Sequence, residues 1–185
     1  MLKRALSILL LVMTLATSGL LSGCATTPAS GLVPFADSKD GYRFLYPNGW
    51  IPAKPKADID VLFHDIIEPA ENVSMVISPL SSVSKISELG DATAIGTRLQ
   101  QRVIAPEGSG RTATLIRAEQ KEIKDKNYYQ FEYAVTRQNG APRHEIVSVA
   151  EKRGNLYTLS ASTSESRWPK VKDLLQRVIS SLTLD

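Results

Sequence analysis

The chain has 185 residues and carries 22 lysines and arginines against 19 aspartates and glutamates, a net charge of +3. Two of the cations, Lys3 and Arg4, lie in an N-terminal segment that we expect to be removed, so the remaining chain is close to neutral. A nearly neutral domain gives no reason to expect a nucleic-acid partner, and about 150 residues suffice for one domain with a real core.

The N-terminus has the composition of a bacterial signal sequence. Lys3 and Arg4 precede an uncharged apolar run over residues 5–21, which is short for a stable membrane span. The run leads into Leu-Ser-Gly-Cys, which resembles the lipobox that directs a diacylglycerol to the cysteine. We therefore expect residues 1–23 to be a lipoprotein signal peptide and Cys24 to be lipidated. The alternative is an ordinary signal peptide in which Cys24, the only cysteine of the chain, is coincidental.

Residues 24–36 are expected to form a flexible, lipidated tether between the membrane and the domain. Pro28, Gly31 and Pro34 interrupt regular structure in this stretch, which carries no charge. Two or three acyl chains on Cys24 would hold the protein firmly at a membrane surface. The folded domain is therefore expected to span residues 37–185.

The first half of this domain predicts three strands and one helix. Alternation over residues 42–46 and apolar, β-rich stretches over 61–67 and 73–80 indicate strands. A helical period follows over 87–104, although Gly90 and Gly96 weaken that helix. The apolar positions of the expected helix are Leu89, Ala92, Ile95, Leu99 and Val103.

The second half predicts a four-stranded antiparallel meander followed by a helix. Turn signals at 124–127, at Asn139-Gly140 and at 153–155 separate four strand-like segments between residues 112 and 162. A helix is expected from Pro169, a good first helical residue. Its apolar stripe consists of Val171, Leu174, Leu175, Val178, Ile179 and Leu182.

Strands in hairpins, with one helix in mid-chain and one at the end, indicate an α+β fold. The stretches 61–67 and 146–150 are apolar on both faces, which predicts helices on both sides of a mostly antiparallel sheet. The side chains expected in the core are Tyr129, Phe131, Tyr133, Leu174, Leu175 and Val178.

Candidate metal ligands are few, because His64 and His144 are the only histidines. Each precedes a carboxylate, but neighbours on a strand point to opposite faces, so neither pair can chelate an ion alone. His144 follows the Asn139-Gly140 turn and Glu165 lies near the end of the last strand, so these two could meet. Imidazole with carboxylate suits weakly bound zinc or manganese at an exposed site. The alternative is two solvated surface histidines.

Arg167 and Trp168 precede the last helix and are a candidate docking site, because both residue types are enriched in binding hot spots. The alternative is that Trp168 seals the edge of the core. No serine lies in a nucleophile elbow, and no other motif assembles a nucleophile with a base, so we expect no catalytic activity.

Five segments, taken together, resemble the PsbP family of extrinsic photosystem II proteins. They are "GYRFLYPNGW", "NVSMVISPL", "SELGDA", "KNYYQFEYAVT" and "GNLYTLSASTSESRW", which match in order and spacing across residues 37–185. With the lipobox, the chain resembles the cyanobacterial lipoprotein form of that family. The resemblance implies an α/β/α sandwich with a central antiparallel sheet. Plant members also carry a histidine and an acidic residue at the places of His144 and Glu165.

The resemblance implies a lumenal protein that associates with photosystem II subunits. Plant members help to retain calcium and chloride at the manganese cluster, but much of that role is credited to a longer N-terminal extension, which the lipid and tether replace here. We therefore expect a non-catalytic, monomeric assembly or stabilising protein without a required cofactor, anchored to the lumenal side of the thylakoid membrane or the periplasmic side of the plasma membrane. Calcium association follows from the resemblance alone. The alternative is a periplasmic metal-binding or enzymatic lipoprotein that shares only the fold.

Overall fold

The computed structural model describes residues 31–55, 58–80, 85–138 and 140–185. The expected signal peptide, Cys24 and Asn139 lie outside these residues. Within them, no helix has both the length and the apolar character needed to cross a membrane.

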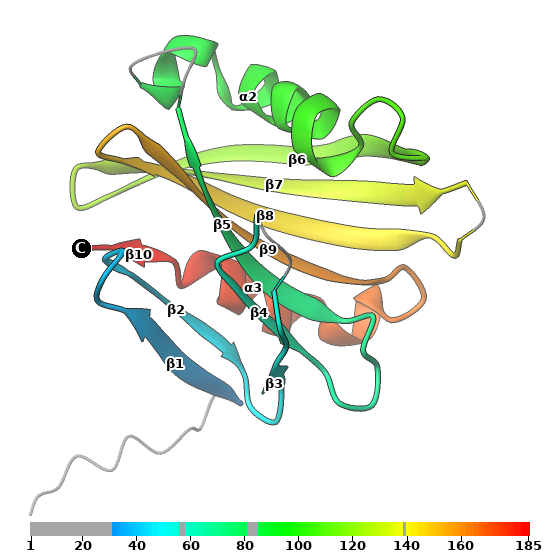
Figure 1. Ribbon diagram of the computed structural model, residues 1–185. Coiled ribbons are helices and arrows are strands. Elements are labelled where there is room, and N and C mark those ends of the chain that lie inside the picture. The colour runs from blue at the N-terminus through cyan, green and yellow to red at the C-terminus, as the bar shows by residue number, and fades with distance from the viewer. Residues whose placement is uncertain (1–30, 56–57, 81–84, 139) are drawn as a thin grey trace, which may run out of the picture.

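A seven-stranded antiparallel sheet forms the middle layer of the fold (Figure 1). Helix α2 (Ala92–Leu99) covers one face of this sheet. Helix α3 (Trp168–Ser180) and a small second sheet cover the other face, so the predicted α+β sandwich is confirmed. The central strands, in spatial order, are β3 (Ile51–Pro52), β4 (Val61–His64), β5 (Asn72–Pro79), β9 (Asn155–Ser164), β8 (Arg143–Lys152), β7 (Lys126–Arg137) and β6 (Arg111–Ile123).

The predicted meander is β6-β7-β8-β9, and its turns have the geometry that tight hairpins need. Lys124 and Asp125 join β6 to β7, and Arg153 and Gly154 join β8 to β9. All four residues have positive φ, between 52° and 74°. Two consecutive residues in this conformation twist the turn in the same sense as the strands, which fixes the register on both sides.

On the α2 face, the alternation of β7 determines the core. Tyr129, Phe131 and Tyr133 are buried against Ile95 and Leu99, as predicted. The other members of this cluster are Ile86, Ile104, Val135, Val147 and Val149. Burial of such side chains stabilises the fold by roughly 1.5–3 kcal/mol each.

Gly96 allows α2 to lie close to the sheet. A Cβ atom at this position would come within 2.9 Å of the Phe131 ring. The Tyr133 hydroxyl donates a hydrogen bond to the Gly96 carbonyl oxygen at 2.9 Å. The glycine that weakens the helix in isolation therefore serves helix–sheet packing.

The helix expected over 87–104 is in fact divided into three parts, which corrects the prediction. A 3₁₀ turn, η1 (Ile86–Leu89), ends at Gly90, whose φ is 114°. Helix α2 then begins after Asp91, whose side chain caps the Ala94 N–H at 2.8 Å. A π-helical segment, η2 (Gln100–Ile104), follows. Because a π turn contains an extra residue, Val103 is 50% exposed and Ile104 takes its place in the core.

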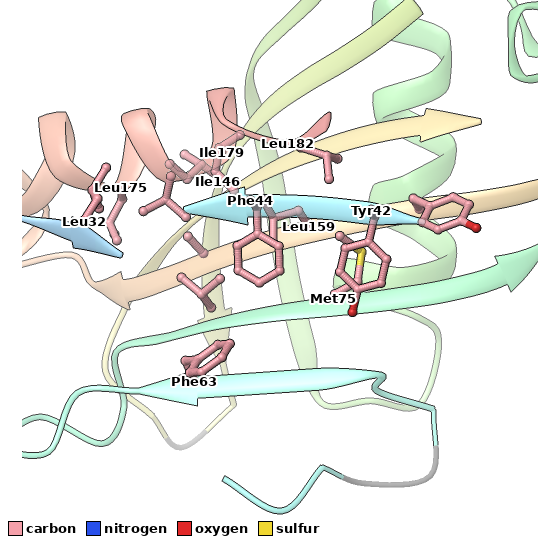
Figure 2. Packing of buried hydrophobic residues seen from close by; sticks show 14 of the residues in the cluster. Leu32, Tyr42, Phe44, Phe63, Met75, Ile146, Leu159, Leu175, Ile179 and Leu182 are labelled. Carbon is pink, nitrogen blue, oxygen red and sulfur yellow. The ribbon is translucent and has the colours of Figure 1, made fainter. Parts of the chain in front are cut away.

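On the other face, α3 and the small sheet enclose the second cluster. Leu175 and Val178 are buried as predicted, and Leu174 packs at the margin. Figure 2 shows Phe44 and Leu159 within this layer. The small sheet has the order β1-β2-β10, formed by β1 (Leu32–Asp37), β2 (Tyr42–Pro47) and β10 (Thr183–Leu184).

Strand β1 corrects the predicted boundary between tether and domain. Residues 32–36 were expected in the tether, but they pair with β2 from Leu32 opposite Pro47 to Asp37 opposite Tyr42. Pro34 was taken as a sign of a linker. It is tolerated because β1 lies at the edge of its sheet, where a missing N–H costs no ladder hydrogen bond.

The strand expected over 61–67 is shorter than predicted. Strand β4 ends at His64, and Ile66 and Ile67 are 64% and 83% exposed. The Asp65 side chain accepts the N–H groups of Ile67 and Glu68, which turns the chain away from the sheet. The two isoleucines therefore do not contribute to a doubly covered strand.

Candidate functional site

A buried polar cluster lies where α3 begins. His144 comes from β8 and is only 3% exposed. The register places Ala134 of β7 opposite His144 and Glu132 opposite Ile146, so Glu132 lies on the same face of the sheet as the imidazole. The Glu165 N–H donates to the Pro142 carbonyl at 3.0 Å, which holds the loop before α3 beside the start of β8.

The imidazole of His144 lies between two carboxylates. Its Nε2 is 2.8 Å from Glu132 Oε1 and its Nδ1 is 2.9 Å from Glu165 Oε2. Both ring nitrogens therefore have a hydrogen-bonding partner, as a buried polar ring requires. The two contacts fix the orientation of the imidazole inside the protein.

Trp168 completes the enclosure of His144. The two rings stack with centroids 3.8 Å apart and an angle of 12° between their planes. Trp168 is 7% exposed, so the prediction of an exposed docking aromatic is wrong and its alternative, a residue that seals the core edge, is correct. Lys172 covers the indole with its ammonium 5.8 Å from the ring centroid.

Arg167 is held in place by a second buried acid, Glu71. Glu71 is 3% exposed and accepts hydrogen bonds from Thr163 Oγ1 at 2.7 Å and from the Nε and Nη2 groups of Arg167. These bonds raise the pKa of Arg167 above its ordinary value. Arg167 therefore fastens the start of α3 to the turn before β5, and its guanidinium is not free for a partner in this structure.

The second histidine is not brought to this cluster. The strand register places His64 opposite Asn72, and Asn72 opposite Ser162. Ser162 in turn lies opposite Glu145 on β8. Directly opposite residues share a face, so His64 lies on the face of Glu145, whereas the next residue on β8, His144, points the other way. The two histidines cannot bind one ion together. His64 Nδ1 lies 2.9 Å from the Asp65 carbonyl oxygen.

The His144 cluster could hold a metal ion only at one side of the ring. Nδ1 and Glu165 offer one nitrogen and one carboxylate, and the Glu165 side chain is 47% exposed. Glu132 faces the opposite nitrogen, so it does not converge on the same point. Two protein ligands suit a weakly held zinc or manganese ion with the remaining positions filled by water. The site is buried at the imidazole rather than exposed, which corrects the expectation of solvated histidines for His144.

Sequence reasoning missed a group of three carboxylates, Asp37, Asp40 and Asp60, whose oxygens lie within 4.8 Å of one another. Asp37 Oδ1 accepts the backbone N–H groups of Lys39 and Asp40, and Asp60 accepts the Tyr42 hydroxyl. Burial and the bond to Asp60 raise the pKa of Tyr42 above its ordinary value. The group therefore already stabilises the turn after β1, and only the fold brings Asp60 to it.

Comparison with known proteins gives consistent matches along the domain. A family model described as PsbP matches residues 30–184. The chain is similar to CyanoP of Thermosynechococcus vestitus, with 46% identity over 89% of this chain and 91% of that protein. CyanoP of Synechocystis sp. is 40% identical over 98% of each chain. The solution structure of cyanobacterial PsbP (CyanoP) from Synechocystis sp. PCC 6803 superposes with a TM-score of 0.72 and 39% identity, covering 90% of this chain and all of the other.

Proposed function

The chain belongs to the PsbP family, and from that premise we propose that it is a non-catalytic, membrane-attached protein of the thylakoid lumen that associates with photosystem II. Its role is to support the assembly or stability of the oxygen-evolving complex. The observation that carries this proposal is the match to CyanoP along 98% of both chains, which includes the segments around Glu71, His144 and Trp168.

The arrangement of His144 supports a role without catalysis. Both of its ring nitrogens face carboxylates. A general base needs a free nitrogen beside a nucleophile or a substrate proton. The buried groups instead fix the position of α3 on the sheet, which suits a protein that works by contact.

A strain that lacks the gene tests the role. We expect oxygen evolution and the recovery of photosystem II after photodamage to be slower than in the wild type, but not abolished. Reintroduction of the full chain should restore both rates. A deletion strain that recovers at the wild-type rate would overturn the proposed role and leave the family membership intact.

Attachment to the membrane is proposed to occur through Cys24. Confinement to a surface raises the effective concentration of a protein near its membrane partner, so a modest interface is then sufficient. Cys24→Ala should release the protein into the soluble lumenal or periplasmic fraction, whereas Thr26→Ala, just outside the lipobox, should not. Sedimentation of Cys24→Ala with membranes in high salt would show that the lipid is not the main anchor.

Metal binding is a secondary proposal that rests on the accessible side of His144. Zinc or manganese would use Nδ1 of His144 together with Glu165, and would bind more weakly at lower pH because the ligating nitrogen must lose its proton. Glu165→Gln should weaken zinc binding in calorimetry more than His64→Ala does. Unchanged zinc affinity in a His64→Ala/His144→Ala variant would exclude both histidines as zinc ligands.

Retention of calcium and chloride is expected to be minor, so the deletion strain should show little extra loss of oxygen evolution when these ions are scarce.

A further inference from the structure

Three arginines gather at one end of the central sheet, on the face that α2 covers. Arg111 of β6 and Arg137 of β7 lie directly opposite each other in the register. Arg143 of β8 lies opposite Val135, two residues before Arg137 on the same face. Like charges directly opposite on a sheet repel, so this pairing costs stability unless something offsets it. We call Arg111, Arg137 and Arg143 the arginine rim.

The arginine rim makes no ion pair within the described residues. Arg111 Nη1 donates to the Ile104 carbonyl at 3.4 Å. Arg143 donates to Ser162 Oγ at 2.7 Å and to the Ala70 carbonyl at 2.5 Å. All of these acceptors are neutral. The guanidinium charges are therefore not cancelled by direct contacts.

Two carboxylates, Glu145 and Glu71, act on the arginine rim from nearby. Burial raises the pKa of Glu145, while the fields of Arg111, Arg143 and Arg137 lower it in part. Burial and the charge of Arg137 also lower the pKa of Arg143. Glu71 is bound by Arg167, so only Glu145 is left to offset the three guanidiniums, and a surplus of positive charge remains at this end of the sheet.

A hollow of about 570 Å³ lies at this end of the sheet and is lined by Arg111 and Arg137 and also by Thr112 and Thr136, so it lies at the end of the β6–β7 pair and is not confined to one face. Its lining contains no large apolar side chain, so it suits a polar rather than an apolar occupant. Guanidinium groups bind carboxylates through two parallel hydrogen bonds, which gives direction as well as charge. The rest of the lining is Gly108, Gly110 and Gln138.

The described chain begins with β1, in the layer that lies on the other side of the sheet from α2 (Figure 1). The chain therefore enters the described domain on one face of the sheet, and the arginine rim lies on the opposite face. This placement favours a protein over the lipid surface as the source of the negative charge. We propose that the arginine rim binds an acidic segment of a protein partner, whose carboxylates contact Arg111 and Arg137.

A fluorescein-labelled hexaglutamate peptide tests the proposal on the full chain held in neutral phosphatidylcholine bicelles. Fluorescence anisotropy should show binding that weakens as salt is added, because charge attraction is screened. Arg111→Glu/Arg137→Glu should weaken binding by at least about tenfold. Arg117→Glu is the matched control, because Arg117 lies on the same strand but already pairs with Glu119 at 2.5 Å. Its effect should stay below about twofold.

The milder variant Arg111→Gln/Arg137→Gln, checked for an unchanged circular dichroism spectrum, separates loss of charge from loss of fold. It should also weaken binding of the peptide. The proposal is overturned if the double variants bind the peptide as the wild type does, or if Arg117→Glu weakens binding equally. It is also overturned if bicelles containing phosphatidylglycerol displace the peptide from the wild type in an arginine-dependent way, since the occupant would then be a lipid surface. Photosystem II is absent from this test, so a failure here leaves the proposed function standing.

Discussion

The two faces of the central sheet carry charged groups in contrasting arrangements. Beneath α3, His144 lies between two carboxylates, and Arg167 and Glu71 bind each other, so the charged groups are matched and largely enclosed. On the α2 face, Arg111 and Arg137 face each other without an ion pair in the described residues. Matched charges can hold a fold together, whereas repelling charges cannot. The comparison suggests that the α3 cluster serves structure and the arginine rim serves binding.

We expect the largest loss of stability from a substitution in the apolar core that lies between the α3 helix and the sheet. Leu175 is 1% exposed on the inner face of α3. Leu175→Ala should lower the free energy of unfolding by about 2–5 kcal/mol, through lost burial and the cavity left behind. Urea denaturation measures this change and sets the scale for the polar substitutions. A loss below about half a kcal/mol would mean that α3 does not pack as described.

The next effect concerns the matched cluster itself. His144→Ala removes two charge-assisted hydrogen bonds and the stack on Trp168, so unfolding free energy should fall by about 2–4 kcal/mol. His64→Ala is the control, because His64 is only partly buried and lies outside the cluster; its cost should be below about 1 kcal/mol. Equal losses in the two variants, measured in the same denaturant series, would show that the His144 cluster adds no more stability than a histidine outside it.

Glu145 should show a pH effect of opposite sense to that of an ordinary stabilising carboxylate. A carboxyl whose pKa is raised by folding contributes stability below its unfolded pKa, and this contribution is lost as pH rises through the folded pKa. Burial raises the pKa of Glu145, so the wild type should lose stability relative to Glu145→Gln as the pH rises above the unfolded carboxyl pKa of about 4.3 and through the raised folded pKa. Thermal unfolding at several pH values measures the difference. If Glu145→Gln lost stability relative to the wild type over that range, Glu145 would be held as an ion pair instead.

The smallest effect is expected within the arginine rim. Arg137 is exposed and faces Arg111, so Arg137→Gln should change the free energy of unfolding by less than about 0.5 kcal/mol, with a slight gain favoured. Denaturation at low and high salt checks the result, because screening should reduce any gain. A loss of more than about 1 kcal/mol would show that Arg137 is part of the structural framework after all.

The sequence predicted those parts of the fold that follow from regular spacing. The alternation of Tyr129, Phe131 and Tyr133 gave the buried face of β7, and the stripe through Leu175 and Val178 gave the buried face of α3. The sequence did not predict that Ile104 replaces Val103 in the core. A π turn shifts the buried face by one residue, and the 3.6-residue spacing of apolar positions does not reveal where such a turn occurs.

Only part of the candidate site could be predicted from the sequence. His144 and Glu165 were identified, but Glu132 was not, because its position beside the imidazole depends on the register across the β7–β8 hairpin. Glu71 and Arg167 are in contact although they are 96 residues apart in the sequence, and Arg111 lies opposite Arg137 only because β6 pairs with β7. Contacts of this kind are set by tertiary structure and have no local pattern.

Affinity isolation of the tagged full chain from detergent-solubilised thylakoid membranes tests the central claim most directly, namely that this protein works by contact with photosystem II. The chain should recover photosystem II subunits, mainly in immature complexes, and the tagged chain with Cys24→Ala should recover less because it is no longer held at the membrane. Repeated isolations that yield the chain itself without any photosystem II subunit would contradict the account.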